Sequence, residues 1–241
     1  MKTAITVKDL KIRYKSIQKY SIKRNLLRLK PVESKAFEAV RGVSFEVQMG
    51  EILGIVGKNG SGKSTLLRSL ANIFSPDEGS IDLYSHSVSL LAIGVGFKPE
   101  LTGRENIMLS GMLLGFEEKE ILARIDEIIE FAELGEFIDM PVRTYSSGMH
   151  SKLAFSVTAI LETDIMLIDE VLSVGDERFR KKSYNKMKSL ISEKTRTVVI
   201  VSHNLNALEE LCDRVMWLHD GKIREIGEPK EVLAAYKEFM K

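Results

Sequence analysis

The segment that most restricts the fold of this 241-residue chain is GKNGSGKST, residues 57–65. It matches the pattern G-x-x-x-x-G-K-[ST], in which glycines let the backbone curl until its N–H groups converge on phosphate oxygens. The apolar run EILGIVG leads into the loop, and a helical pattern with Leu66, Leu67 and Leu70 follows it. This order of strand, loop and helix predicts a nucleotide site in an α/β fold and disfavours an ordinary glycine-rich turn.

Three residues of this loop have individual roles that follow from the pattern. The Lys63 ammonium should pair with the β and γ phosphates, the Ser64 hydroxyl should hold Mg²⁺, and Thr65 should reach the α phosphate. The N-terminus of the following helix adds a partial positive charge. The predicted nucleotide-binding residues of the loop are Gly57, Lys58, Asn59, Gly60, Ser61, Gly62, Lys63, Ser64 and Thr65.

The second half of the chain alternates strand and helix patterns. Such βα units predict a mostly parallel sheet with helices on both faces, so the fold class is α/β. The predicted strands are 165–168, 197–202 and 214–219, and the predicted helices are 176–191, 204–212 and 229–240.

Two other regions depart from this alternation. Residues 3–14 and 43–48 alternate apolar and polar side chains, which predicts an N-terminal antiparallel β subdomain. Helical spacing dominates from Leu101 to Ser146, which predicts a helical subdomain inserted over about residues 100–162. We expect the whole chain, residues 1–241, to form a single domain.

Polar side chains follow two of the predicted strands. Asp169 and Glu170 end the run IMLIDE, and His203 follows TVVIVS, so all three should lie at the carboxyl edge of the sheet, where open α/β sheets bind ligands. Asp169 is expected to meet the Mg²⁺ held by Ser64. Glu170 is expected to orient or deprotonate the attacking water, and His203 to sense the γ phosphate. Alternatively, Asp169 and Glu170 are a carboxylate pair solvated at the surface, and His203 has only a structural role.

Composition narrows the class of protein. The formal net charge is +1, which gives no global electrostatic reason to expect nucleic acid as a partner. The single cysteine, Cys212, cannot form an internal disulfide and is expected to be a core thiol of a cytosolic chain. Neither a secretory signal nor an apolar run approaching about 20 residues is visible. If the chain takes part in a membrane process, we expect it to bind at the membrane surface.

The segment YSSGM, residues 145–149, places a Ser-Gly pair at a predicted helix start about twenty residues before the Asp169 strand. Together with the phosphate loop, the helical insert and His203, it resembles the ATP-binding subunits of ABC transporters, and the α/β fold is then a P-loop ATPase core. The resemblance covers nearly the whole chain and is greatest to the branch that exports polysaccharides, O-antigens and teichoic acids. The similar stretches are GFKPELTGRENI, YSSGMHSKLAFS, IDEVLSVGD, SHN and CDRVMWLHDGKI.

The resemblance implies a shared site and a membrane partner. Two copies would pack head to tail, with ATP between one phosphate loop and Ser146, Ser147 and Gly148 of the other copy. Asp176 would couple the two sites, and Tyr14, or alternatively Tyr20, would stack on adenine. An integral-membrane permease would carry a lipid-linked glycan, with this chain bound at the cytoplasmic face of the membrane. The alternatives are a soluble non-transport ABC-type ATPase acting on ribosomes or nucleic acid, and a different P-loop enzyme.

The chain departs from the family pattern at three positions. Ser147 and Met149 replace the usual Gly and Gln, a variant typical of the exporter branch, whereas Ile93 stands where a metal-contacting Gln is expected.

The loop over about residues 15–37 is strongly basic. It is either a solvated hairpin or a surface for anionic lipid head groups or a diphosphate-linked glycan. The cations proposed for that surface are Lys19, Lys23, Arg24 and Arg28.

Overall fold

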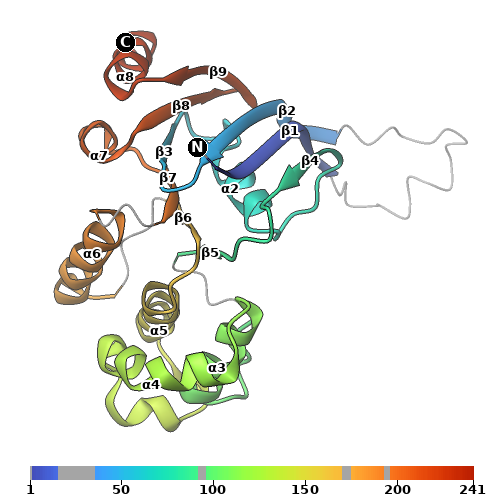
Figure 1. Ribbon diagram of the computed structural model, residues 1–241. Coiled ribbons are helices and arrows are strands. Elements are labelled where there is room, and N and C mark those ends of the chain that lie inside the picture. The colour runs from blue at the N-terminus through green and yellow to red at the C-terminus, as the bar shows by residue number, and fades with distance from the viewer. Residues whose placement is uncertain (1, 16–35, 92–95, 170–174, 193–195) are drawn as a thin grey trace, which may run out of the picture.

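The computed structural model describes residues 2–15, 36–91, 96–169, 175–192 and 196–241. A six-stranded sheet runs through the upper part of the molecule (Figure 1). Its first five strands are parallel, and the last pairs antiparallel with its neighbour. Their order is β5 (Val88–Leu90), β6 (Ile165–Asp169), β7 (Thr197–Val201), β3 (Ile52–Val56), β8 (Arg214–His219) and β9 (Lys222–Gly227).

The central strands are apolar throughout because both faces of this sheet are covered. Every residue of β3 and β7 is buried, as expected for parallel strands between two layers. One face packs against α2 (Lys63–Leu70) and the N-terminal strands, and the other against three helices, which lie to the left in Figure 1. These helices are α6 (Glu177–Ser192), α7 (Leu205–Leu211) and α8 (Pro229–Phe239).

The N-terminal strands form a separate antiparallel sheet. Its order is β2 (Ala36–Gln48), β1 (Thr3–Lys15) and β4 (Glu78–Asp82). The prediction of a strand over 43–48 was too short, because β2 pairs with β1 as far back as Lys15. Pairing along the whole length of β1 extends β2 beyond the segment in which its own polar–apolar alternation is clear.

A helical lobe lies below the sheet in Figure 1. Its helices are α3 (Gly103–Leu113), α4 (Glu118–Ala132) and α5 (Ser147–Ile160), with the 3₁₀ turns η1 (Gly135–Asp139) and η2 (Val142–Thr144) between the last two. The lobe has its own apolar core, which includes Ile107, Ile121 and Leu153. Phe155 of α5 also packs into the core on one face of the six-stranded sheet, so α5 joins the lobe to the rest of the chain.

Most of the predicted elements are present with small shifts at their ends, and one was missed. β5 contains three residues and pairs in parallel with β6 at the edge of the sheet. So short a strand carries no periodic signal, and only its pairing with β6 identifies it. Among the described residues, no helix has the length and apolar character needed to cross a membrane.

Candidate functional site

The phosphate loop connects β3 to α2 through backbone conformations that glycine alone adopts at no steric cost. Gly62, at the N-cap of α2, has φ 100°, and Gly60 has φ 79°. A side chain at Gly57 would collide with the carbonyl oxygen of Leu218, and one at Gly62 with that of Ala39. Because Gly62 has no side chain to cap α2, the first N–H groups of this helix can bind an anion.

Lys63 lies folded against the loop that carries it. Its Nζ donates hydrogen bonds to the carbonyl oxygens of Gly57 at 2.6 Å and Lys58 at 3.0 Å. The side chain is buried, so the ammonium is held at a fixed place on the loop. Lys63 also lines the cavity described below, and its role as a phosphate ligand stays a prediction.

The two residues predicted to hold a divalent metal lie together. The Ser64 hydroxyl donates a 3.3 Å hydrogen bond to Oδ1 of Asp169. Ser64 is the second residue of α2 and Asp169 ends β6, so residues 105 positions apart meet at the carboxyl edge of the sheet. A hydroxyl and a carboxylate are oxygen ligands of the kind that Mg²⁺ prefers. Glu170 lies outside the described residues.

A cavity of about 340 Å³ opens beside this pair. Its volume falls within the range of small-molecule sites. Most of the predicted nucleotide and metal residues line it, together with three residues that were not predicted, Phe37, Ala39 and Val201. Of the loop residues, Gly57, Lys58 and Ser61 do not line the cavity. The predicted residues that do are Tyr14, Asn59, Gly60, Gly62, Lys63, Ser64, Thr65, Asp169 and His203.

Two aromatic side chains, Tyr14 and Phe37, line the cavity. Tyr14 and Phe37 are cross-strand partners in β1 and β2, and their side chains are 40% and 55% exposed. The Tyr14 hydroxyl lies 3.1 Å from Oγ1 of Thr65, which connects β1 directly to α2. Tyr14 thus lines the cavity, and its stacking on adenine stays a prediction, whereas Tyr20, the alternative, lies outside the described residues. Phe37 was missed because its register with Tyr14 appears only once β2 is known to start at Ala36.

The other predicted segment does not reach the cavity within this chain. Ser146 caps α5, its Oγ accepting a hydrogen bond from the Met149 N–H at 3.2 Å. Ser146 and Ser147 are exposed and Gly148 is partly so, all on the helical lobe. Their position agrees with a segment that serves a neighbouring molecule, and it leaves the shared site a prediction.

Asp176 also lies apart from the cavity, at the start of α6. Its Oδ2 accepts a 2.7 Å hydrogen bond from Nζ of Lys152, and its Oδ1 accepts one from the Phe179 N–H. The hydrogen bond from Lys152 is the main cause that lowers the pKa of Asp176 to about 2. Asp176 is therefore ionised at any physiological pH.

The structure describes Cys212 but not the positions of Ile93 and most of the basic loop. Cys212 is a free, buried thiol, as expected, and burial raises its pKa to about 12. Ile93 and the basic loop over residues 16–35 lie outside the described residues.

Comparison with known proteins identifies the family. Residues 40–173 match the ABC transporter family model. The chain is 45% identical over 209 residues to the O-antigen export system ATP-binding protein RfbB of Klebsiella pneumoniae, covering 87% of this chain and 85% of that one. It is 46% identical to RfbB of Myxococcus xanthus, over 86% of this chain and 47% of that one. It is 45% identical to the teichoic acids export ATP-binding protein TagH of Enterococcus faecalis, over 97% of this chain and 54% of that one.

The chain thus spans about half the length of the M. xanthus and E. faecalis proteins. Solved structures share its fold at 23% identity. An ATP-binding subunit of an ABC transporter superposes with a TM-score of 0.73, over 98% of this chain and 94% of that one. The dimeric ATP-binding cassette MJ0796 with ADP and Pi superposes with a TM-score of 0.69, over 93% and 98%. The chain belongs to the ABC transporter family.

Proposed function

We propose that this chain is the ATP-hydrolysing subunit of an exporter of a lipid-linked cell-surface polysaccharide, such as an O-antigen or a teichoic acid. The observation that carries the ATPase half of the proposal is the hydrogen bond between Ser64 and Asp169 at the mouth of the phosphate loop. The names of relatives that are 45–46% identical to the chain support the export half, since they are ATP-binding proteins of O-antigen and teichoic acid export systems.

In the proposed site, the cavity holds ATP with its base between Tyr14 and Phe37 and its phosphates on the loop. Backbone N–H groups of residues 60–65 and the Lys63 ammonium would bind the phosphate oxygens. Ser64 and Asp169 would hold Mg²⁺, which neutralises charge on the phosphates when it is bound. Glu170 would orient the attacking water, and His203, which lines the cavity, would contact the γ phosphate.

Ser146, Ser147 and Gly148 would complete the site from a second copy packed head to tail. Support comes from their exposure on the helical lobe and from their absence from the cavity lining of their own chain. The N-terminus of α5, with the hydroxyls of Ser146 and Ser147 beside it, suits the outer face of a bound triphosphate. One chain alone would then bind ATP but turn it over poorly.

We further propose that the chain works at the cytoplasmic face of the membrane, bound to a separate integral-membrane permease. In this arrangement the permease carries the glycan across the bilayer, and closure of the dimer on ATP supplies the free energy. Purifying the tagged chain from detergent-solubilised membranes and identifying its partner by mass spectrometry tests this point. A polytopic membrane protein is the expected partner, whereas ribosomal proteins or nucleic acid would contradict the export assignment.

The ATPase assignment has its own test. Glu170→Gln should bind ATP with an affinity near that of the unmodified chain and lose nearly all turnover, since only the activation of water is removed. With ATP bound, this variant should sediment as a dimer. Turnover by Glu170→Gln at the full rate would refute the role of Glu170, and a monomer under all nucleotide conditions would refute the shared site.

A further inference from the structure

Lys152 connects the two segments that the proposed dimer would present to its partner copy. It lies in α5, the helix that begins just after Ser146, and its Nζ reaches Asp176 in front of α6 at 2.7 Å. The same ammonium lies 5.1 Å from the centroid of the Phe179 ring. A charge-assisted hydrogen bond and a cation–π contact thus hold one cation between two elements.

Asp176 is held from both sides. While Oδ2 accepts from Lys152, Oδ1 accepts the Phe179 N–H at 2.9 Å and so begins α6. A carboxylate with both oxygens bonded has little freedom to rotate. Its side chain is still 60% exposed, so it remains open to a further contact from outside the chain.

The backbone next to Asp176 is adapted to Lys152. Gly175 has φ +71°, and a methyl group there would lie 2.9 Å from Cε of Lys152. The Lys152 side chain is 15% exposed, so its stem is packed against this glycine rather than extended into solvent. Glycine at position 175 therefore leaves the space that the lysine occupies.

We infer that Lys152 is a positioning residue that fixes Asp176 relative to Ser146–Gly148, so that both segments meet the partner copy as one preformed unit. The inference rests on the proposed head-to-tail dimer. The unit is assembled within each chain before any second copy arrives. Dimer closure then does not have to order Asp176 and the start of α5 separately, which would cost conformational entropy.

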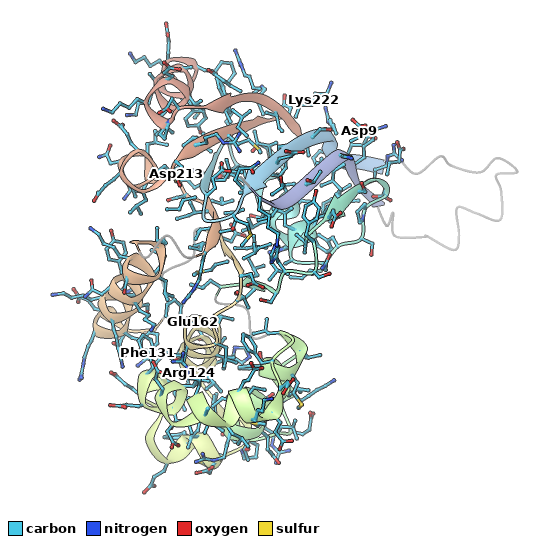
Figure 2. All side chains as sticks on the ribbon, in the orientation of Figure 1. Asp9, Arg124, Phe131, Glu162, Asp213 and Lys222 are labelled. Carbon is cyan, nitrogen blue, oxygen red and sulfur yellow. The ribbon has the colours of Figure 1, made fainter. Side chains whose placement is uncertain are left out.

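The chain contains a matched control for this inference. Lys182 of α6 donates to Oε1 of Glu133 at 2.7 Å and lies 4.4 Å from the centroid of the Phe131 ring. Phe131, labelled in Figure 2, belongs to α4 of the helical lobe. Lys152→Met and Lys182→Met therefore each remove one charge, one carboxylate partner and one cation–π contact, but only the first releases Asp176.

The test is steady-state ATPase kinetics of the full chain. Lys152→Met should lower kcat by about tenfold or more, because small displacements at an active site have effects of this size, with a smaller change in the KM for ATP. Lys182→Met should stay within about twofold of the unmodified chain in both constants, and Lys152→Arg should recover most of the lost kcat. Asp176→Asn combined with Lys152→Met should be little worse than either change alone.

The possible outcomes separate the inference from the function on which it rests. If the unmodified chain hydrolyses ATP and Lys152→Met matches Lys182→Met, the positioning role is wrong and the ATPase assignment stands. If the effects of Lys152→Met and Asp176→Asn are additive, Lys152 does not act through Asp176. The proposed function itself is contradicted if the unmodified chain does not hydrolyse ATP and the Glu170→Gln variant does not dimerise with ATP bound. Equal melting temperatures for Lys152→Met and Lys182→Met would show that a difference in kcat does not come from a difference in stability.

Discussion

The backbone N–H of Gly221 donates a 3.0 Å hydrogen bond to the carbonyl oxygen of Ser61. The carbonyl oxygen of Gly221 in turn accepts the Arg41 N–H at 2.8 Å. Through these two bonds the turn between β8 and β9 holds the phosphate loop on one side and β2 on the other. The shape of the loop therefore depends on a hairpin that comes some 160 residues later in the chain.

Gly221→Ala should weaken ATP binding. Gly221 has φ +76°, and a methyl group there would lie 2.8 Å from the Ala39 carbonyl oxygen, so the turn must shift and pull on Ser61. We expect the Kd for ATP, measured by isothermal titration calorimetry, to rise roughly fivefold, which corresponds to about 1 kcal/mol. The control is Gly115→Ala, whose φ is +95° but whose new methyl group would touch nothing within 4 Å. Equal ATP affinities for the two variants would contradict the coupling.

Loss of either proposed metal ligand, the Ser64 hydroxyl or the Asp169 carboxylate, should abolish most metal-dependent turnover. Ser64→Ala and Asp169→Asn are each expected to lower kcat in saturating Mg²⁺ by about a hundredfold or more, as loss of an electrostatic contact to reacting groups typically does. ATP affinity in the presence of EDTA should change little. Ser69→Ala is the control, because its hydroxyl bonds to the Thr65 carbonyl on the same helix but does not line the cavity. A normal Mg²⁺ titration of Ser64→Ala would overturn the assignment.

Phe37→Ala should lower nucleotide affinity through loss of stacking. An aromatic ring on a base contributes about 1–3 kcal/mol, and we expect the lower end because Phe37 is 55% exposed. The Kd for a fluorescent ATP analogue should therefore rise about fivefold to tenfold. Phe137→Ala removes a ring that is 45% exposed on η1, away from the cavity, and should leave the Kd unchanged. An unchanged Kd for Phe37→Ala would remove Phe37 from the site.

The cation–π contacts at the end of α8 should contribute to the stability of the fold. The Phe239 ring lies 4.9 Å from Nζ of Lys58 and 4.4 Å from the Arg224 guanidinium, which also lies 4.3 Å from the Trp217 ring. Phe239→Ala should lower the melting temperature by about 2–4 °C, as expected for a loss near 1 kcal/mol in a chain of this length. Met240→Ala, at a residue that is 48% exposed, should change it by less than about 1 °C. A melting temperature for Phe239→Ala equal to that of Met240→Ala would show that the stack contributes nothing.

The ion pair of Asp176 should be visible in an acid titration followed by NMR. The folded pKa of about 2 lies below the ordinary aspartate pKa of 3.8, so the pair stabilises the fold above pH 3.8 and loses its effect as the pH falls toward 2. In Lys152→Met the pKa of Asp176 should rise toward 3.8, whereas in Lys182→Met it should stay near 2. A pKa that is the same in both variants would mean that Lys152 does not stabilise the carboxylate.

The sequence was most informative where a local pattern has a local cause. Residues 57–65 predicted their own strand, loop and helix, because glycine requirements and helix-terminus chemistry are set within the segment. Asp169 was assigned correctly to the carboxyl end of a strand, because an apolar run that ends in a carboxylate indicates one edge of a parallel sheet.

The features that sequence reasoning missed depend on pairing between distant segments. β5 is defined by its pairing with β6, and Phe37 reaches the cavity through its register with Tyr14. The hydrogen bond between Lys152 of α5 and Asp176, just before α6, joins residues 24 positions apart. No periodicity within one segment indicates such contacts, because they arise from how segments that are distant in the sequence pair and pack against each other.

The strand order of the six-stranded sheet has a consequence for the synthesis of the chain. β3 carries the phosphate loop, but its two neighbours, β7 and β8, begin at Thr197 and Arg214. On the ribosome, β3 therefore emerges long before either strand that can pair with it, while the helical lobe has mostly local contacts and can fold first. We expect the nascent chain to acquire nucleotide binding only after β8 has left the exit tunnel, and the apolar β3 to need protection from aggregation until then.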